Sequence, residues 1–177
     1  FNWKTGNAVT STLLFINKGD GTFEQGVTGN LPQLGNGLLA VSDFDNDGYP
    51  DVAIHGDIPG DTWQRIAKVY RNNGDNTFTD TGVVLPVEEI NSLSWADYDN
   101  DGRTDLAVSV GSQIYGVLGE LYLYRNLGNG NFSTVIHPIE ASGTIVWADY
   151  DNDGRIDFIA CGRNKTAIYR NAGDGIF

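Results

Sequence analysis

The chain alternates between short apolar runs and turns rich in glycine, asparagine and aspartate. In the clearest run, Glu120 to Asn126, the segment Leu-Tyr-Leu-Tyr shows the period of two that is typical of a β-strand. Shorter apolar runs cover residues 38–42, 51–55 and 67–71, and β-branched and aromatic residues are frequent in them. No segment keeps the 3.6-residue period of a helix. The sequence therefore predicts an all-β fold of short strands joined by tight turns.

This pattern repeats along the chain. Acidic nine-residue segments begin at residues 43, 97 and 149, and we name them the first, second and third loops: Asp43–Asp51, Asp97–Asp105 and Asp149–Asp157. A motif of the form Asn-x-Gly-(Asp/Asn)-x-x-Phe recurs at residues 17–23, 72–78, 126–132 and 171–177, and its last three copies follow Tyr-Arg. Four antiparallel strands in a repeat of about 50 residues are typical of a β-propeller blade.

The repeat predicts two whole blades and two partial ones. The whole blades cover residues 38–91 and 92–143, and the partial blades cover residues 1–37 and 144–177. The predicted fold is thus an incomplete ring of about three to four blades, because closed propellers typically have about four to eight. The remaining blades belong either to a longer parent protein or to other copies of the chain. Since the sequence starts in mid-repeat and contains no methionine, we favour a piece of a longer parent.

The three loops share one arrangement of acidic residues. Each has a carboxylate at the first, third, fifth and ninth places and glycine at the sixth. Four carboxylates so close together repel one another unless a cation lies between them. Oxygen ligands of this kind suit Ca²⁺, which takes about six to eight of them, and glycine lets the chain turn around the ion. The predicted ligands of three calcium ions, including the main-chain carbonyl at the seventh place, are Asp43, Asp45, Asp47, Tyr49, Asp51, Asp97, Asp99, Asp101, Arg103, Asp105, Asp149, Asp151, Asp153, Arg155 and Asp157. The alternative is three solvated acidic turns without an ion, since aspartate and asparagine also favour turns.

Composition narrows the classes of partner. The formal net charge is −12, which would repel nucleic acids and anionic membranes, so we expect neither as a partner. No run of 18 apolar residues predicts a transmembrane span. The single cysteine, Cys161, lies in an apolar run and is predicted to be a buried strand residue. Bound metal can stabilise a fold that has no disulfide, so the composition is compatible with an extracellular protein.

The loops and the aromatic-glycine motif together resemble the FG-GAP and VCBS repeats of integrin-α-type β-propellers. The resemblance covers essentially the whole chain and is carried by the DxDxDGxxD loops followed by Tyr-Arg-Asn-x-Gly-Asp-Gly-x-Phe. It implies a secreted or cell-surface propeller with its calcium loops on one face. It also implies that ligands meet loops of the opposite face. Such repeats occur in adhesion receptors, lectins and polysaccharide-degrading enzymes, so the resemblance alone does not assign a function.

The connections after the second strand of each unit are the predicted ligand-binding loops, because they differ most between the repeats. Trp63, Arg65 and Tyr115 are the candidate ligand residues, with the alternative that they only cover neighbouring loops. Trp95 and Trp147 recur two residues before an acidic loop and are predicted to pack between blades. Aromatic residues recur inside the loops, at Phe44, Tyr98 and Tyr150, and are predicted to shield the ion.

The favoured function is an extracellular recognition or adhesion module for glycan or protein ligands. Alternatives are the propeller portion of a secreted polysaccharide lyase and an architectural spacer. The sequence contains no Ser-His-Asp grouping, zinc motif or phosphate loop, and we predict no catalytic residue and no cofactor besides Ca²⁺.

Overall fold

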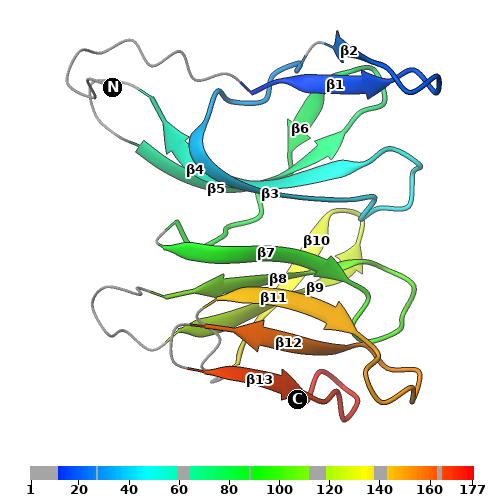
Figure 1. Cartoon of the computed structure of the whole chain (residues 1–177), viewed down its shortest axis with the longest axis vertical. Helices are drawn as coiled ribbons and strands as arrows, with labels where there is room; N and C mark the ends of the chain where they lie inside the picture. The colour runs from blue at the N-terminus through cyan, green and yellow to red at the C-terminus, as the bar shows by residue number, and fades with distance from the viewer. Residues whose placement is uncertain are drawn as a thin grey trace.

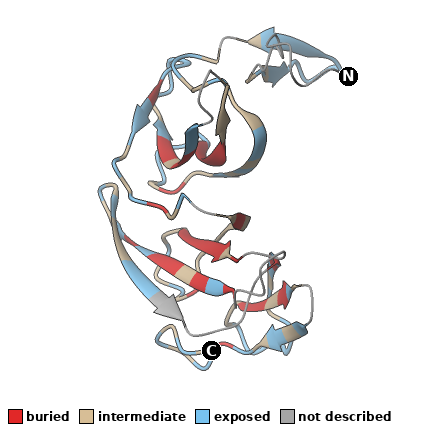
Figure 2. Cartoon of the chain, turned by 90° about the vertical axis from the view of Figure 1, so that its left-hand side faces the viewer, coloured by how far each residue is buried: buried red, intermediate tan, exposed pale blue. Residues whose placement is uncertain are grey.

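The computed structural model describes residues 12–26, 28–59, 64–87, 89–111, 119–137, 143–162 and 165–177, in which all regular structure is β-strand. Thirteen strands form four antiparallel sheets in these residues (Figure 1). The predicted all-β fold is confirmed. The sheets have the form of whole and partial propeller blades, and they follow one another along an open curve without closing a ring (Figure 2).

Each sheet is built from strands that are consecutive in the sequence. The first sheet is a hairpin of β1 (Leu14–Asn17) and β2 (Phe23–Gly26). The next contains β3 (Gly35–Ser42), β4 (Asp51–Ile58), β5 (Gln64–Asn72) and β6 (Phe78–Asp80). The third contains β7 (Ile90–Ala96), β8 (Asp105–Val110), β9 (Glu120–Gly128) and β10 (Asn131–His137). The last contains β11 (Thr144–Ala148), β12 (Asp157–Cys161) and β13 (Thr166–Tyr169).

The second strand of each four-stranded sheet is the most deeply buried. In β4 the six residues Asp51 to Gly56 are all buried, and in β8 Asp105 to Ser109 are buried as well. Such strands pair on both edges and are covered on both faces, which explains why their sequences are apolar without alternation. Strand β9 instead shows the predicted alternation, with Leu121 and Leu123 fully buried.

Apolar side chains fill the space between neighbouring sheets. Trp95 of β7 stacks on Phe44 of the preceding sheet, with ring centroids 5.9 Å apart and an interplanar angle of 9°. Trp147 of β11 packs against a cluster that includes Leu121 and Leu123 of the preceding sheet, and its ring meets that of Phe158 edge-on. The predicted packing of both tryptophans between blades is therefore confirmed.

Phe44 lies in the core between the sheets, where it also contacts Phe132. Its shielding of an ion stays a prediction. Cys161 is exposed at the end of β12, so its predicted burial is wrong. The reason is that β12 belongs to a sheet that carries no further sheet on its outer face among the described residues.

No helix that is both long and apolar enough to cross a membrane occurs in the described part of the chain.

Candidate metal sites

The three acidic loops all connect the first strand of a sheet to the second. They join β3 to β4, β7 to β8, and β11 to β12, and these first strands run in the same direction, so the loops lie along one edge of the molecule (Figure 1). The sixth residue of each loop has the positive φ that favours glycine, 90° at Gly48 and 85° at both Gly102 and Gly154. Sequence and geometry therefore agree on how each loop turns.

The first carboxylate holds its loop closed. In the first loop, Asp43 accepts hydrogen bonds from the backbone N–H groups of Asp47 and Gly48, at 3.0 and 2.9 Å. Asp97 and Asp149 make the same pair of bonds in their loops. This carboxylate is thus fixed by the backbone of the loop that it faces.

The ninth carboxylate is buried at the start of the following strand. Asp105 is 1 % exposed and accepts hydrogen bonds from the N–H groups of Tyr98 and Asn126, at 3.2 and 2.7 Å. Burial raises the pKa of Asp105 to about 7, and burial likewise raises the pKa of Asp51 to about 6, although two N–H groups oppose the rise in each case. Both groups therefore lie where a negative charge is costly without a nearby cation.

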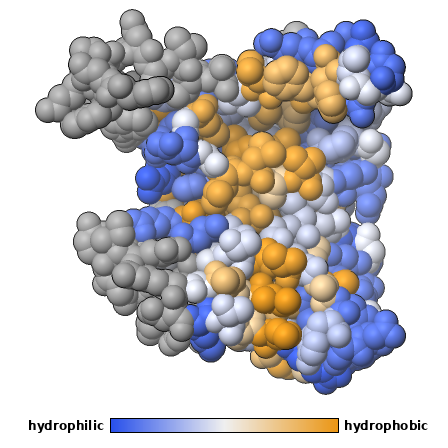
Figure 3. Space-filling model, viewed as in Figure 1, coloured by the Kyte–Doolittle hydropathy of each residue, from blue (hydrophilic) through white to orange (hydrophobic). Residues whose placement is uncertain are grey.

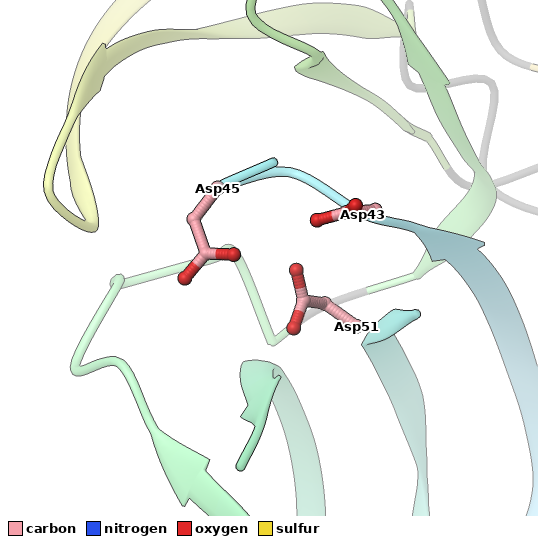
Figure 4. A group of neighbouring side chains, drawn as sticks. All are labelled: Asp43, Asp45 and Asp51. Atoms are coloured by element: carbon pink, nitrogen blue, oxygen red, sulfur yellow. The ribbon is translucent and has the colours of Figure 1, made fainter. Parts of the chain in front are cut away.

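Three carboxylates converge in each loop. One oxygen of each lies within 4.8 Å of the others, in groups of Asp43, Asp45 and Asp51, of Asp97, Asp99 and Asp101, and of Asp149, Asp151 and Asp157. Figure 4 shows the first group, in which Asp45 reaches from the loop toward Asp43 and Asp51 at the two strand ends. Asp45 Oδ1 is buried and has no hydrogen-bond partner in the described structure. A buried acceptor of this kind is costly unless a cation or donor is bound.

In the three sheets that carry an acidic loop, an arginine in the third strand or directly after it contacts the third and fifth carboxylates. Arg71 Nε lies 2.7 Å from Asp45 Oδ2, and its Nη2 lies 3.0 Å from Asp47 Oδ2. Arg125 and Arg170 make the corresponding contacts in the other loops. In the first loop the guanidinium takes the Oδ2 atoms and leaves Asp45 Oδ1 free. The sequence analysis missed these residues, although their recurrence after tyrosine was a visible signal.

The asparagines that follow Arg125 and Arg170 each link their own acidic loop to the loop of the preceding sheet. Asn126 Nδ2 donates to the carbonyl of Thr104 in its own sheet, and to that of Phe44 in the first loop, at 2.7 Å. Asn171 repeats this arrangement with Ile156 and Tyr98.

Neighbouring loops also contact each other directly. Asn46 Nδ2 donates to the carbonyl of Gly102, and Asn100 Nδ2 donates to that of Gly154. The three loops therefore form a continuous strip joined by side-chain amides.

Of the candidate ligand residues, Trp63 and Tyr115 lie outside the described residues. Arg65 lies on β5, and its Nε donates to Asp57 Oδ1 at 3.0 Å across the β4–β5 pair. The arginine side chain is 44 % exposed. The structure therefore places Arg65 at the sheet edge opposite the acidic loops.

The donor set of these loops fits a divalent cation that prefers oxygen. Carboxylates supply the side-chain ligands that converge, with no sulfur or nitrogen ligand among them, and the first loop has a buried oxygen without a partner.

Comparisons with known proteins show which family the repeat belongs to. No curated protein shows significant sequence similarity to the chain. A model of the FG-GAP-like repeat matches residues 43–108 and 114–160. These two segments contain all three acidic loops. Because these segments make up more than half of the 177 residues, the chain belongs to the FG-GAP-like repeat family.

Proposed function

We propose that the chain is a calcium-stabilised, extracellular β-propeller module that recognises a glycan or protein ligand. Its blades are residues 38–91 and 92–143, with partial blades over 1–37 and 144–177. The observation that carries the proposal is the convergence of three carboxylates in each of three equivalent loops, with an unpartnered buried oxygen at Asp45.

Calcium would relieve the electrostatic cost of these loops. The ninth carboxylate is buried, and the pKa values of Asp51 and Asp105 are raised because burial penalises the charged form. A divalent cation in the loop favours the charged form and would lower both values. The fifteen ligand residues predicted from the sequence would hold three ions, with the carbonyls of Tyr49, Arg103 and Arg155 completing the shells.

The expected stabilisation is large on the scale of a small domain. An extracellular-type site with a Kd of about 10⁻⁴ M contributes about 1.4 kcal/mol at millimolar calcium. Three such sites contribute about 4 kcal/mol, which is close to the whole stability of some domains. Sites of this affinity fill at the calcium concentration found outside cells, which supports an extracellular location.

Native mass spectrometry of the chain with calcium and with chelator tests the metal part of the proposal. We expect three calcium ions per chain, and two when Asp45 is replaced by alanine. The matched control is Asp57→Ala, which removes an aspartate outside the loops and should leave three ions. A chain that binds no calcium at millimolar concentration would contradict the proposal.

The edge opposite the acidic loops is where we place the ligand. Strands β4, β8 and β12 lead away from the acidic loops and end at that edge, where the connections to β5, β9 and β13 begin. These connections differ in length, over residues 59–63, 111–119 and 162–165. Variable loops on a repeated scaffold commonly carry recognition.

Binding of the chain to a glycan array in the presence of calcium tests whether a ligand binds at this edge. Retention should be lost when Trp63 and Tyr115 are both replaced by alanine, while the three calcium ions stay bound. Arg65→Gln should weaken retention less, because Arg65 is already paired with Asp57. If the double variant is retained as strongly as the unchanged chain, the ligand does not bind at this edge.

A further inference from the structure

The seventh place distinguishes the first loop from the other two. It is occupied by Tyr49 in the first loop and by Arg103 and Arg155 in the second and third. Arg103 Nη2 contacts Asp101 Oδ2, and its Nε donates to the carbonyl of Asn126 at 2.8 Å. Arg155 makes the same two contacts, with Asp153 and with Asn171.

The fifth carboxylate therefore has different neighbours in the different loops. Asp47 contacts one guanidinium, that of Arg71. Asp101 contacts two, those of Arg103 and Arg125, and both reach the same Oδ2 atom. Asp153 Oδ2 is likewise shared by Arg155 and Arg170. The other oxygen of each fifth carboxylate accepts the N–H of the seventh residue.

The charge of the loops differs accordingly. With four carboxylates and one contacting arginine, the first loop has a net charge of −3 when its carboxylates are ionised. With two contacting arginines, the second and third loops each have a net charge of −2. Calcium affinity in loops of one architecture depends on the charge of the ligand set.

The third carboxylate differs between the first two loops in the hydrogen bond that one of its oxygens makes. Asp45 Oδ1 is buried without a hydrogen-bond partner, and the Asp45 side chain lies close to Asp43 and Asp51 (Figure 4). The equivalent oxygen of Asp99 accepts the N–H of Asp101 at 3.3 Å. The second loop also has a buried third-carboxylate oxygen without a hydrogen bond, Asp99 Oδ2 beside Arg125 Nε, so the two loops differ only in the bond to this one oxygen.

We propose that the first loop binds calcium more tightly than the second and third, because the arginine at the seventh place of those two loops acts as a built-in counter-cation. This inference rests on the proposed function, since it concerns the order in which the same three sites fill. An exposed ion pair contributes up to about 1 kcal/mol, which corresponds to a difference of about fivefold in affinity.

The seventh place can be exchanged between loops. The ring of Tyr49 lies against Gly74 in the turn after β5, and the side chain of Arg103 lies near Gly128 in the equivalent turn after β9. Both side chains thus occupy the same position relative to their sheets, so Tyr49→Arg and Arg103→Tyr are matched substitutions.

Isothermal titration calorimetry of the chelated chain, with native mass spectrometry to count the ions, tests the order. We expect one ion to bind about fivefold more tightly than the other two. Asp45→Ala should remove the tight site, and Asp151→Ala should remove one of the weak sites. Tyr49→Arg should leave three weak sites.

Arg103→Tyr should convert the second loop into a second tight site, a gain that a damaged fold cannot produce. The control is Arg65→Tyr, which removes the same charge outside the loops and should leave the pattern of one tight and two weak sites. Three equal sites in the unchanged chain, or no gain in Arg103→Tyr, would overturn the inference while leaving calcium binding intact. A chain that binds no calcium at all would instead overturn the proposed function as well.

Discussion

Asp105 combines a structural and a candidate metal-binding role in one side chain. Its two oxygens accept the backbone N–H groups of Tyr98 and Asn126, and both bonds are buried. Removing the carboxylate would leave two buried donors without partners, whether or not an ion is bound.

We expect Asp105→Ala to lower the free energy of unfolding by about 2–5 kcal/mol in chelator, because each unpartnered buried group costs about 1–3 kcal/mol. Asp105→Asn should cost less, since its amide oxygen can still accept one bond. Urea unfolding in the absence of calcium checks both values. The exposed Asp80→Ala is the control and should cost less than about 1 kcal/mol. An equally small effect of Asp105→Ala would show that the buried bonds contribute little.

His55 is a buried histidine on β4, away from the acidic loop that precedes this strand. Burial lowers its pKa, and the guanidinium of Arg65 lowers it further, while the carboxylate of Asp57 and the backbone at Val87 act in the opposite direction. The folded state therefore favours neutral His55 relative to the unfolded chain, whose histidine titrates near about 6.5. The stability that comes from neutral His55 is present above that pH and is lost as the pH falls below it.

We expect the free energy of unfolding, measured in saturating calcium, to fall between about pH 7.5 and pH 5.5. His55→Leu should fall less over the same range, because leucine has no proton to gain. The difference between the two proteins isolates the contribution of His55, because the carboxylates of the loops are the same in both. Parallel pH curves for the two proteins would contradict this assignment.

At the scale of the element, hydrogen bonds join the β7–β10 and β11–β13 sheets to the acidic loop of the sheet before them. Asn126 belongs to β9 and is 1 % exposed, and its amide reaches back to Phe44 in the first loop. Asn72 holds the equivalent place on β5, but in the described structure its amide donates only within its own sheet, to Pro50. Comparison of the two asparagines therefore measures the contribution of the contact between sheets.

Asn126→Ala should lower the free energy of unfolding by about 2–4 kcal/mol, because three hydrogen bonds are lost and two of the acceptors are left without this donor. Asn72→Ala should cost about 1 kcal/mol, since its contacts are closer to solvent. Urea unfolding in calcium gives both values. Equal losses would indicate that the contact with Phe44 adds no stability.

The sequence was sufficient to predict the elements and the acidic loops. The predicted run 51–55 begins where β4 begins, and the predicted strand Glu120 to Asn126 ends two residues before β9 does. Local alternation and turn residues carry this information. The contacts of Arg125 and Asn126 could not be predicted in this way, because their partners lie on other strands. Asn126 and Phe44, for example, are 82 residues apart in the chain.

At the scale of the whole molecule, the β3–β6 sheet and the β11–β13 sheet each expose apolar residues on the face turned away from the β7–β10 sheet. Val69 and Leu123 are fully buried beneath the following sheet, whereas Ile168, at the equivalent place on β13, is 53 % exposed. At the other end, Leu39 is 63 % exposed, while its counterpart Leu93 packs against the preceding sheet. Apolar residues accordingly gather over β3 in Figure 3. Each face has the chemistry that another sheet of this family would cover.

We expect a second copy of the chain to supply that sheet by head-to-tail association, with the Leu39 face against the Ile168 face. Sedimentation velocity in calcium should show association that increases with concentration. Leu39→Asp and Ile168→Asp should each abolish it, whereas Val84→Asp, at an exposed apolar residue between sheets, should not. A chain that stays monomeric at all concentrations would contradict this expectation.

The amide links between the acidic loops have a mechanical consequence. Asn46 and Asn100 each donate a hydrogen bond to the loop of the next sheet. Among the described residues, Asn152 makes no corresponding bond. A pulling force along the chain would act on the amide-to-carbonyl hydrogen bonds that join the three loops. The β11–β12 loop is bonded to a neighbouring loop on one side only, so we expect the loops to separate first at that end.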